Sequence, residues 1–307
     1  MLTSPISGPE RIVTESYLDR PPAINPPFLA WSPDSYWLAM AGAEKLGEVR
    51  TLFLLSLVSG EKRRITSPPV GGGDSCPAFS PDGRRLAFSR SSDLYPLDLS
   101  VDLNPVAEPK RVTFGNWSAA SPAWTADGNS LIFSGFGLEG SSLWRVDASG
   151  SSKPHRLATL GDNAAYPAVS PRGNRLAYAQ LTVSLPSNVC RIEIPTPGAK
   201  AKPPQKSIAS TIGEAPPEFS PDGRKVAFVS SRSGSSEIWT CDADGSKLVQ
   251  LTSLGSPTFV NGAHWSPDSP RLTFGAETEG LEEVYVTNAS GGSPRCLTSS
   301  THRLGNA

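Results

Sequence analysis

The stretch Phe79-Ser80-Pro81-Asp82-Gly83-Arg84-Arg85-Leu86-Ala87-Phe88 decides the fold, because it recurs in recognisable form six times along the chain. The copies begin at residues 31, 79, 124, 169, 219 and 265, so the spacings between them are 48, 45, 45, 50 and 46 residues. A repeat of roughly 40 to 50 residues with strand-like content is typical of propeller blades. Six copies therefore predict six blades.

Each copy of the repeat predicts a β-hairpin. Pro81 presets φ for the turn, the Asp82 side chain can bond nearby backbone N–H groups, and Gly83 accepts a positive φ. Alternating apolar residues such as Leu86 and Phe88 then open the next strand. The turn carboxylate recurs in five of the six copies, which favours a structural role that every blade needs. The predicted turn residues are Asp34, Asp82, Asp127, Asp222 and Asp268.

A second half follows the hairpin in most copies. The cleanest example has a β-rich run at 237–241, a Gly turn at 242–245 and a short strand that ends in Leu251-Thr252. Two strands from the hairpin and two from this half make the four strands of one propeller blade. The sequence therefore predicts an all-β fold, a six-bladed β-propeller of four-stranded antiparallel blades.

The ends of the predicted ring leave its closure open. We expect an irregular N-terminal segment at 1–27, the propeller at 28–299 and a C-terminal tail at 300–307. Residues 10–15 include a possible closing strand, so either this strand or the one near 295–298 completes the last blade. A third alternative is that the chain is cut from a larger ring. We favour a closed ring of six blades, since closure removes exposed sheet edges.

The composition excludes several classes of partner. The net charge is −1 and the pI is about 6.3, so there is no electrostatic case for binding nucleic acid or an anionic membrane. No apolar run is long enough to span a bilayer, and the first residues lack a signal peptide. We therefore expect a monomer in the cytoplasm, or in the periplasm if the chain is a fragment of an exported or membrane-anchored protein.

Motifs for catalysis and for metal binding are missing from the sequence. The four cysteines form no Cys-x-x-Cys pair, and we expect them as thiols on or under strands. The three histidines, His155, His264 and His302, lie in distant segments. Neither Gly-x-Ser-x-Gly nor a phosphate-binding Gly-rich loop occurs. We therefore predict no catalytic residue, no cofactor and no metal site.

The repeat resembles a known family. The pattern Pro-x-[Phe/Trp]-Ser-Pro-Asp-Gly-x-x-[Leu/Val]-Ala-Phe, followed by Ile-Trp, Asp-Gly and Leu-Thr, resembles the WD-repeat-like propeller repeat of the TolB family, and residues 215–253 match it almost throughout. Similar repeats occur in the propeller half of prolyl-oligopeptidase-type peptidases. They also occur in the sensor-like propeller of bacterial winged-helix regulators, which the run 234–245 resembles. The resemblance implies a six-bladed propeller that binds a protein partner.

The candidate site consists of residues that do not repeat. Ligands of propellers usually bind at the mouth of the central channel, on the loops that lead into the innermost strands. We expect a protein or peptide partner to bind there, with no enzymatic activity. The alternatives are a sensor or gating propeller of a larger regulator or peptidase, and an enzyme with its chemistry at the channel mouth. The predicted binding residues are Asp74, Ser121, Tyr166, Glu214, Asn261 and His264.

Overall fold

The computed structural model describes most of the repeats. The described residues are 29–45, 48–115, 118–137, 140–160, 163–172, 175–181, 188–193, 205–208, 214–255, 258–278 and 281–297. The predicted N-terminal segment 1–27 with its possible strand at 10–15, and the tail at 300–307, lie outside these residues.

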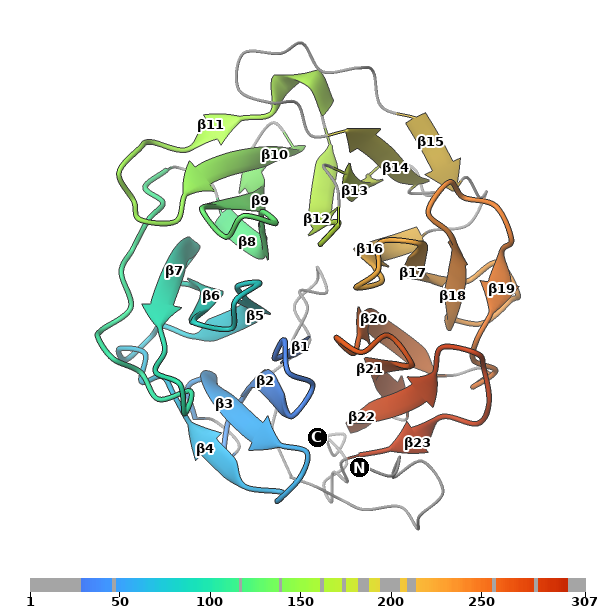
Figure 1. Cartoon of the computed structure of the whole chain (residues 1–307), viewed down its shortest axis with the longest axis horizontal. Coiled ribbons are helices and arrows are strands. Elements are labelled where there is room, and N and C mark those ends of the chain that lie inside the picture. The colour runs from blue at the N-terminus through green and yellow to red at the C-terminus, as the bar shows by residue number, and fades with distance from the viewer. Residues whose placement is uncertain are drawn as a thin grey trace, which may run out of the picture.

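Six small antiparallel sheets are arranged in a ring, so the predicted six-bladed propeller is confirmed (Figure 1). Five sheets have four strands and one has three, and within each sheet neighbouring strands are consecutive in the chain. The innermost strands are β1 (Leu29–Trp31), β5 (Asp74–Phe79), β8 (Ser118–Trp124), β12 (Ala164–Val169), β16 (Glu214–Phe219) and β20 (Phe259–Trp265).

The remaining strands follow outward from the ring centre in chain order. The second strands of the blades are β2 (Trp37–Gly42), β6 (Arg85–Arg90), β9 (Ser130–Gly137), β13 (Arg175–Gln180), β17 (Lys225–Ser230) and β21 (Arg271–Thr278). The third strands are β3 (Thr51–Ser56), β7 (Asp93–Asp98), β10 (Gly140–Asp147), β14 (Asn188–Glu193), β18 (Glu237–Asp242) and β22 (Leu281–Asn288). The outer strands are β4 (Lys62–Arg64), β11 (His155–Arg156), β15 (Gln205–Ile208), β19 (Val249–Gln250) and β23 (Arg295–Cys296).

Helices are nearly absent from the described part of the chain, where the one helical element is the short 3-10 turn η2 (Ala158–Leu160). No helix there is long and apolar enough to cross a membrane. The cysteines in this part are free: Cys76, Cys190 and Cys241 are buried, and Cys296 is half-buried.

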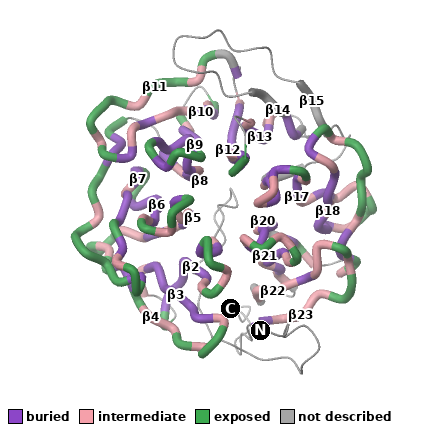
Figure 2. The backbone as a smooth tube through the Cα atoms, viewed as in Figure 1, coloured by how far each residue is buried: buried purple, intermediate pink, exposed green. Residues whose placement is uncertain are grey.

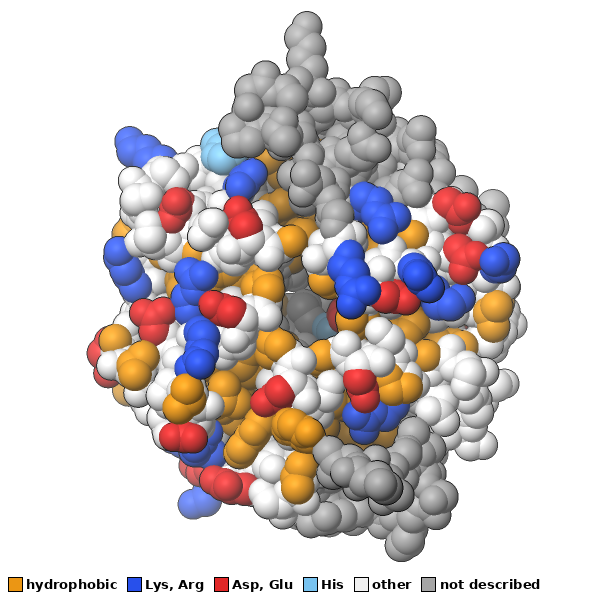
Figure 3. All heavy atoms as spheres, viewed as in Figure 1, with side chains coloured by type: hydrophobic (Ala, Val, Ile, Leu, Met, Phe, Trp, Pro, Cys, Tyr) orange, Lys and Arg blue, Asp and Glu red, His pale blue; other side chains and the backbone are white. Residues whose placement is uncertain are grey.

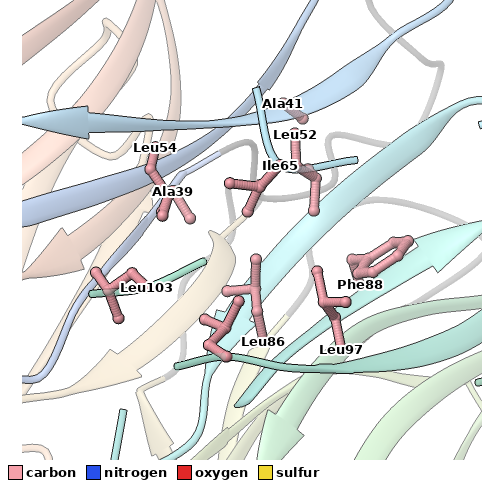
Figure 4. Packing of buried hydrophobic residues seen from close by; sticks show 10 residues of the cluster. Ala39, Ala41, Leu52, Leu54, Ile65, Leu86, Phe88, Leu97 and Leu103 are labelled. Atoms are coloured by element: carbon pink, nitrogen blue, oxygen red, sulfur yellow. The ribbon is translucent and has the colours of Figure 1, made fainter. Parts of the chain in front are cut away.

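The hydrophobic core lies between neighbouring blades. Figure 4 shows one such layer, in which Leu52 and Leu54 of the first blade pack with Leu86 and Phe88 of the second. Similar clusters join the following blades, and burial is concentrated in the middle strands (Figure 2). Large side chains recur in the second strands, where they are almost fully buried: Phe88, Phe133, Tyr178, Phe228 and Phe274. Because each blade buries its faces against two neighbours, the ring is stabilised as a whole.

Contacts between the first and last blades close the ring. Trp31 Nε1 of β1 donates a hydrogen bond of 2.9 Å to Thr273 Oγ1 of β21. The Arg271 guanidinium lies 5.2 Å from the centre of the Trp31 ring, and Val284 of β22 packs against the buried cluster of the first blade. The outer strand β23 pairs with β22, so the fourth strand of the last blade comes from the C-terminal side.

The recurring apolar-Thr pair fixes the outer edge of a blade. Leu251 N–H donates to the Ile238 carbonyl at 2.8 Å, while Thr252 Oγ1 accepts a hydrogen bond from Ile238 N–H at 2.9 Å. Thr66 and Thr113 accept equivalent bonds from their own third strands. The threonine hydroxyl therefore satisfies a buried backbone donor that the short outer strand leaves unpaired.

Candidate functional site

The turn carboxylates bind their own hairpins. Asp82 Oδ1 accepts hydrogen bonds from Ser80 Oγ at 2.6 Å and from Arg84 N–H at 3.0 Å. Ser80 Oγ in turn accepts from Arg85 N–H, which ties the turn to the next strand. Asp34, Asp127 and Asp222 repeat this arrangement, whereas Asp268 contacts Arg271 at 3.4 Å. The hydroxyl bonds lower the pKa of Asp82, Asp127 and Asp222.

The residue after the turn carboxylate adopts a left-handed conformation. Gly83, Gly128 and Gly223 have φ of 69°, 69° and 67°, and two serines occupy the same place with φ of 66° and 68°. Glycine accepts this conformation without strain, which explains its preference at this position. In the fourth blade Arg172 replaces the carboxylate, and Ser170 Oγ donates instead to the Arg172 carbonyl.

A β-bulge interrupts five of the six innermost strands. Ser75 pairs with Ser89 and Ala78 pairs with Ala87, so β5 carries one residue more than β6 between these pairs. The same shift occurs in β8, β12, β16 and β20. A bulge bends a strand and redirects the side chain at the extra position. Three non-glycine residues at this position have positive φ values of 51° to 53°: Cys76, Ser121 and Tyr166.

A cavity of about 370 Å³ lies on the ring axis. Its wall extends from the bulge residues Ser121 and Tyr166 to the prolines of the turns, such as Pro81 and Pro267. Figure 3 shows the hollow at the centre of the ring. As far as the described residues show, the cavity therefore lies along the innermost strands toward their Ser-Pro-Asp turns.

One position of the repeat contributes to the wall from every blade. This wall position directly precedes the large apolar residue of the signature. It holds alanine in the first four blades, glutamate in the fifth and histidine in the sixth. The six residues are Ala30, Ala78, Ala123, Ala168, Glu218 and His264.

Glu218 and His264 form a hydrogen-bonded pair across the junction of β16 and β20. Glu218 Oε2 lies 2.7 Å from His264 Nδ1, and Oε1 accepts a bond of 3.0 Å from Trp265 N–H. The side chains are 32% and 15% exposed, respectively. A side chain at Gly262 would place its Cβ 3.2 Å from His264 Nε2, so the glycine at this bulge leaves room for the imidazole.

The neutral half of the wall contains Ser121 and Tyr166. Tyr166 packs against Phe136 with 6.2 Å between ring centres, and burial raises the pKa of its phenol. Ser121 Oγ is buried and lies near the Cys76 thiol. Burial likewise raises the pKa of Cys76.

The structure brings Ser121, Tyr166 and His264 together in one cavity, but it places Asp74 elsewhere. Asp74 is fully buried, and its carboxylate accepts two bonds from the Arg90 guanidinium at 2.6 and 2.8 Å. An acid held in this way is unavailable to a partner at the channel mouth. Glu214 and Asn261 lie on β16 and β20, and the structure describes their backbone only.

The sequence interpretation did not single out Glu218. The available signal was its position, since glutamate replaces the alanine that four other blades carry before the signature. The described residues contain no group of three or more His, Cys, Asp or Glu side chains that could hold a metal ion. Glu218 and His264 therefore form a polar pair without the third side chain that such a metal site would need among the described residues.

Comparison with known proteins supports the resemblance of the repeats. A family model described as the TolB beta propeller domain matches residues 20–201 and 167–306. The Tol-Pal system protein TolB of Hahella chejuensis is 33% identical over 189 residues, which cover 54% of this chain and 42% of that protein. Dipeptidyl-peptidase 5 of Porphyromonas gingivalis is 27% identical over 184 residues, which cover 56% of this chain and 26% of the peptidase.

A solved structure has the same fold. The structure of a putative TolB from Agrobacterium tumefaciens superposes with a TM-score of 0.65 at 22% identity, covering 77% of this chain and 84% of that one. The chain spans less than half the length of the two curated relatives above. By their names, one is a protein of the Tol-Pal system and the other is a peptidase.

Proposed function

Because the chain belongs to the TolB β-propeller domain family, we propose that it is a non-enzymatic binding module whose axial cavity receives a peptide segment of a protein partner. The observation that carries this proposal is the wall of the cavity. The blades repeat one another at the turns, in the core, at the outer edges and over much of the wall, but Glu218 and His264 break the repeat at the wall position of two blades. A specific surface requires such differences.

The size of the cavity favours a segment over a folded domain. A volume of about 370 Å³ falls near the lower end of the range of small-molecule sites, which is roughly 300 to 1,000 Å³. It has space for one or two side chains of a partner. Alanine, proline and aromatic side chains form most of its wall, which suits apolar contact with an inserted segment.

Binding is favoured over catalysis by the contacts of His264. Its Nδ1 pairs with Glu218, but among the described residues no hydroxyl or thiol is hydrogen-bonded to its other ring nitrogen. A nucleophile beside the base is the usual sign of covalent catalysis. A gating or sensor propeller within a longer protein is the second candidate, since this chain matches 26% of a dipeptidyl-peptidase. That candidate also uses the axial cavity.

The test is a variant with a filled cavity. Ala123→Leu adds volume at a wall position, and Ala107→Leu makes the same change on an exposed loop as the control. A library of random heptapeptides displayed on phage is selected on each immobilised protein. Synthetic versions of the enriched peptides are then titrated by tryptophan fluorescence, because Trp31, Trp124 and Trp265 line the cavity.

We expect the wild type and Ala107→Leu to bind the same peptides with equal affinity, and Ala123→Leu to bind them at least ~10-fold more weakly, since overfilling removes the space they occupy. Thermal unfolding verifies that both variants are folded. Peptides that bind Ala123→Leu as tightly as they bind the wild type would place binding outside the cavity and contradict the proposal.

A further inference from the structure

We propose that the Glu218–His264 pair makes the cavity selective for a basic side chain, a lysine or an arginine, of the inserted segment. This inference rests on the proposed function and specifies its ligand. It starts from an asymmetry of the ring. The wall position is neutral and small in four successive blades, and both polar residues occur in the two neighbouring blades that remain.

The pair presents hydrogen-bond acceptors to the cavity. An ionised carboxylate can only accept, so the 2.7 Å contact makes His264 Nδ1 the donor to Glu218. A neutral imidazole that donates from Nδ1 has a lone pair on Nε2. Each oxygen of Glu218 accepts one bond, from His264 or from Trp265 N–H, and has a second acceptor position that no described residue uses.

The other polar groups of the wall offer little to a negatively charged ligand. The indole N–H groups of the three lining tryptophans already donate within the protein: Trp31 to Thr273, Trp124 to the Ala78 carbonyl and Trp265 to the Glu218 carbonyl. No lysine or arginine is among the described residues that line the cavity. A ligand must therefore bring its own donors, and a positive charge complements Glu218.

Ser121 lines the neutral side of the wall but offers no exposed polar atom to a ligand. The residue is 5% exposed, and its hydroxyl oxygen is buried against the protein. The side chains of Glu218 and His264 are 32% and 15% exposed, so they remain within reach of a ligand in the cavity.

Lysine and arginine have the required combination of groups. Their methylene stems can lie along alanine and proline side chains while the charged end reaches a carboxylate. The rim of the cavity carries both signs of charge, for example Asp82 beside Arg84 and Asp222 beside Arg224, so the discrimination comes from the interior pair.

The experiment repeats the phage selection on the wild type, Glu218→Gln and Glu61→Gln. Glu61 is exposed on the first blade, so its variant is a control for the same chemical change. We expect the wild type and Glu61→Gln to enrich peptides with a basic residue at one position, and Glu218→Gln to lose this enrichment.

Synthetic peptides then measure the discrimination directly. Replacing the basic residue by norleucine, which keeps the stem and removes the charge, should weaken binding to the wild type at least ~10-fold, the usual effect of a charge-assisted hydrogen bond. On Glu218→Gln the ratio between the two peptides should fall toward one. A merely structural role of Glu218 would weaken both peptides alike and leave the ratio unchanged, which would overturn the inference.

The results distinguish the inference from the proposed function. Suppose that Ala123→Leu weakens peptide binding but the selected peptides share no basic residue. This result would refute the charge selectivity and support the binding function. A selection in which no peptide is sensitive to Ala123→Leu would refute both. Both proposals are supported if Ala123→Leu weakens peptide binding and Glu218→Gln removes the preference for a basic residue.

Discussion

Glu218 and Asp222 lie four residues apart on one hairpin, yet their carboxylates serve different parts of the molecule. Asp222 accepts hydrogen bonds from Ser220 and Arg224 of its own turn. Glu218 instead bonds with His264 and Trp265 of the next blade. Asp222 has counterparts in four other blades, whereas Glu218 replaces an alanine that four other blades carry.

The difference separates two kinds of position in a repeat protein. A residue that recurs at one place in nearly every blade satisfies a need that every blade has, such as closing a turn or filling a core. A residue that breaks the repeat on the axial wall satisfies no such general need. The comparison therefore predicts large losses of stability at repeated positions and small ones at the wall.

The largest expected effect is at a repeated core position. Phe228→Ala removes a fully buried ring between the fourth and fifth blades, and it should lower the free energy of unfolding by about 3–5 kcal/mol. Denaturation in urea measures the change. Phe259→Ala, at a residue that is 52% exposed, is the control and should cost less than ~1 kcal/mol. Equal losses in the two variants would contradict the distinction between repeated core and surface.

Much of the fold was predictable because its signals are local and repeated. The turn Ser80–Gly83 has a residue suited to each of its positions, and six copies of it set the number of blades. Pairs such as Leu251-Thr252 marked the outer edges. The contacts between Trp31 and Thr273 that close the ring join residues 242 positions apart, so no local pattern could have revealed them.

The cavity was less predictable, for two physical reasons. The bulges place Ser121 and Tyr166 in a left-handed conformation that usually signals glycine, so no residue type marked the extra residue of these strands. Asp74 resembled a polar residue at the channel mouth, but Arg90, sixteen residues later, pairs with it inside the blade. Glu218 was detectable in principle as a break in the repeat.

A smaller effect is expected at the turn carboxylate. Asp222→Ala removes two hydrogen bonds from the turn and should lower the free energy of unfolding by about 1–2 kcal/mol at neutral pH. The bond from Ser220 lowers the pKa of Asp222 in the folded state. Its contribution is therefore present above the unfolded-state value of about 3.9 and is lost as the pH falls through the lower folded value.

The pH dependence gives the measurement for this turn. The difference in unfolding free energy between the wild type and Asp222→Ala should be largest near neutral pH and should shrink as the pH is lowered below about 4. Asp82 and Asp127, whose pKa values are also lowered, should behave in the same way. A difference that grows in acid would show that the carboxylate does not stabilise the turn in its ionised form.

The smallest effect on stability is expected at the wall. The double variant Glu218→Ala/His264→Ala gives all six blades the same residue at the wall position. Since four blades already carry alanine there, the backbone accepts it, and the change in unfolding free energy should stay within ~1 kcal/mol. The variant loses the hydrogen bond from Trp265 N–H to Glu218, which lowers stability. Because the pair is partly exposed, water can enter the space it leaves and accept that bond instead.

The double variant also tests whether breaks in the repeat mark function. Urea denaturation measures its stability, and titration with a selected peptide measures its binding. Nearly wild-type stability together with binding weakened at least ~10-fold would assign the pair to the ligand. A loss of stability as large as that of Phe228→Ala would instead make the pair a structural clamp between the fifth and sixth blades. In that case a break in the repeat would mark the place where two particular blades need an extra bond, and the axial wall would carry no more specificity than the turns.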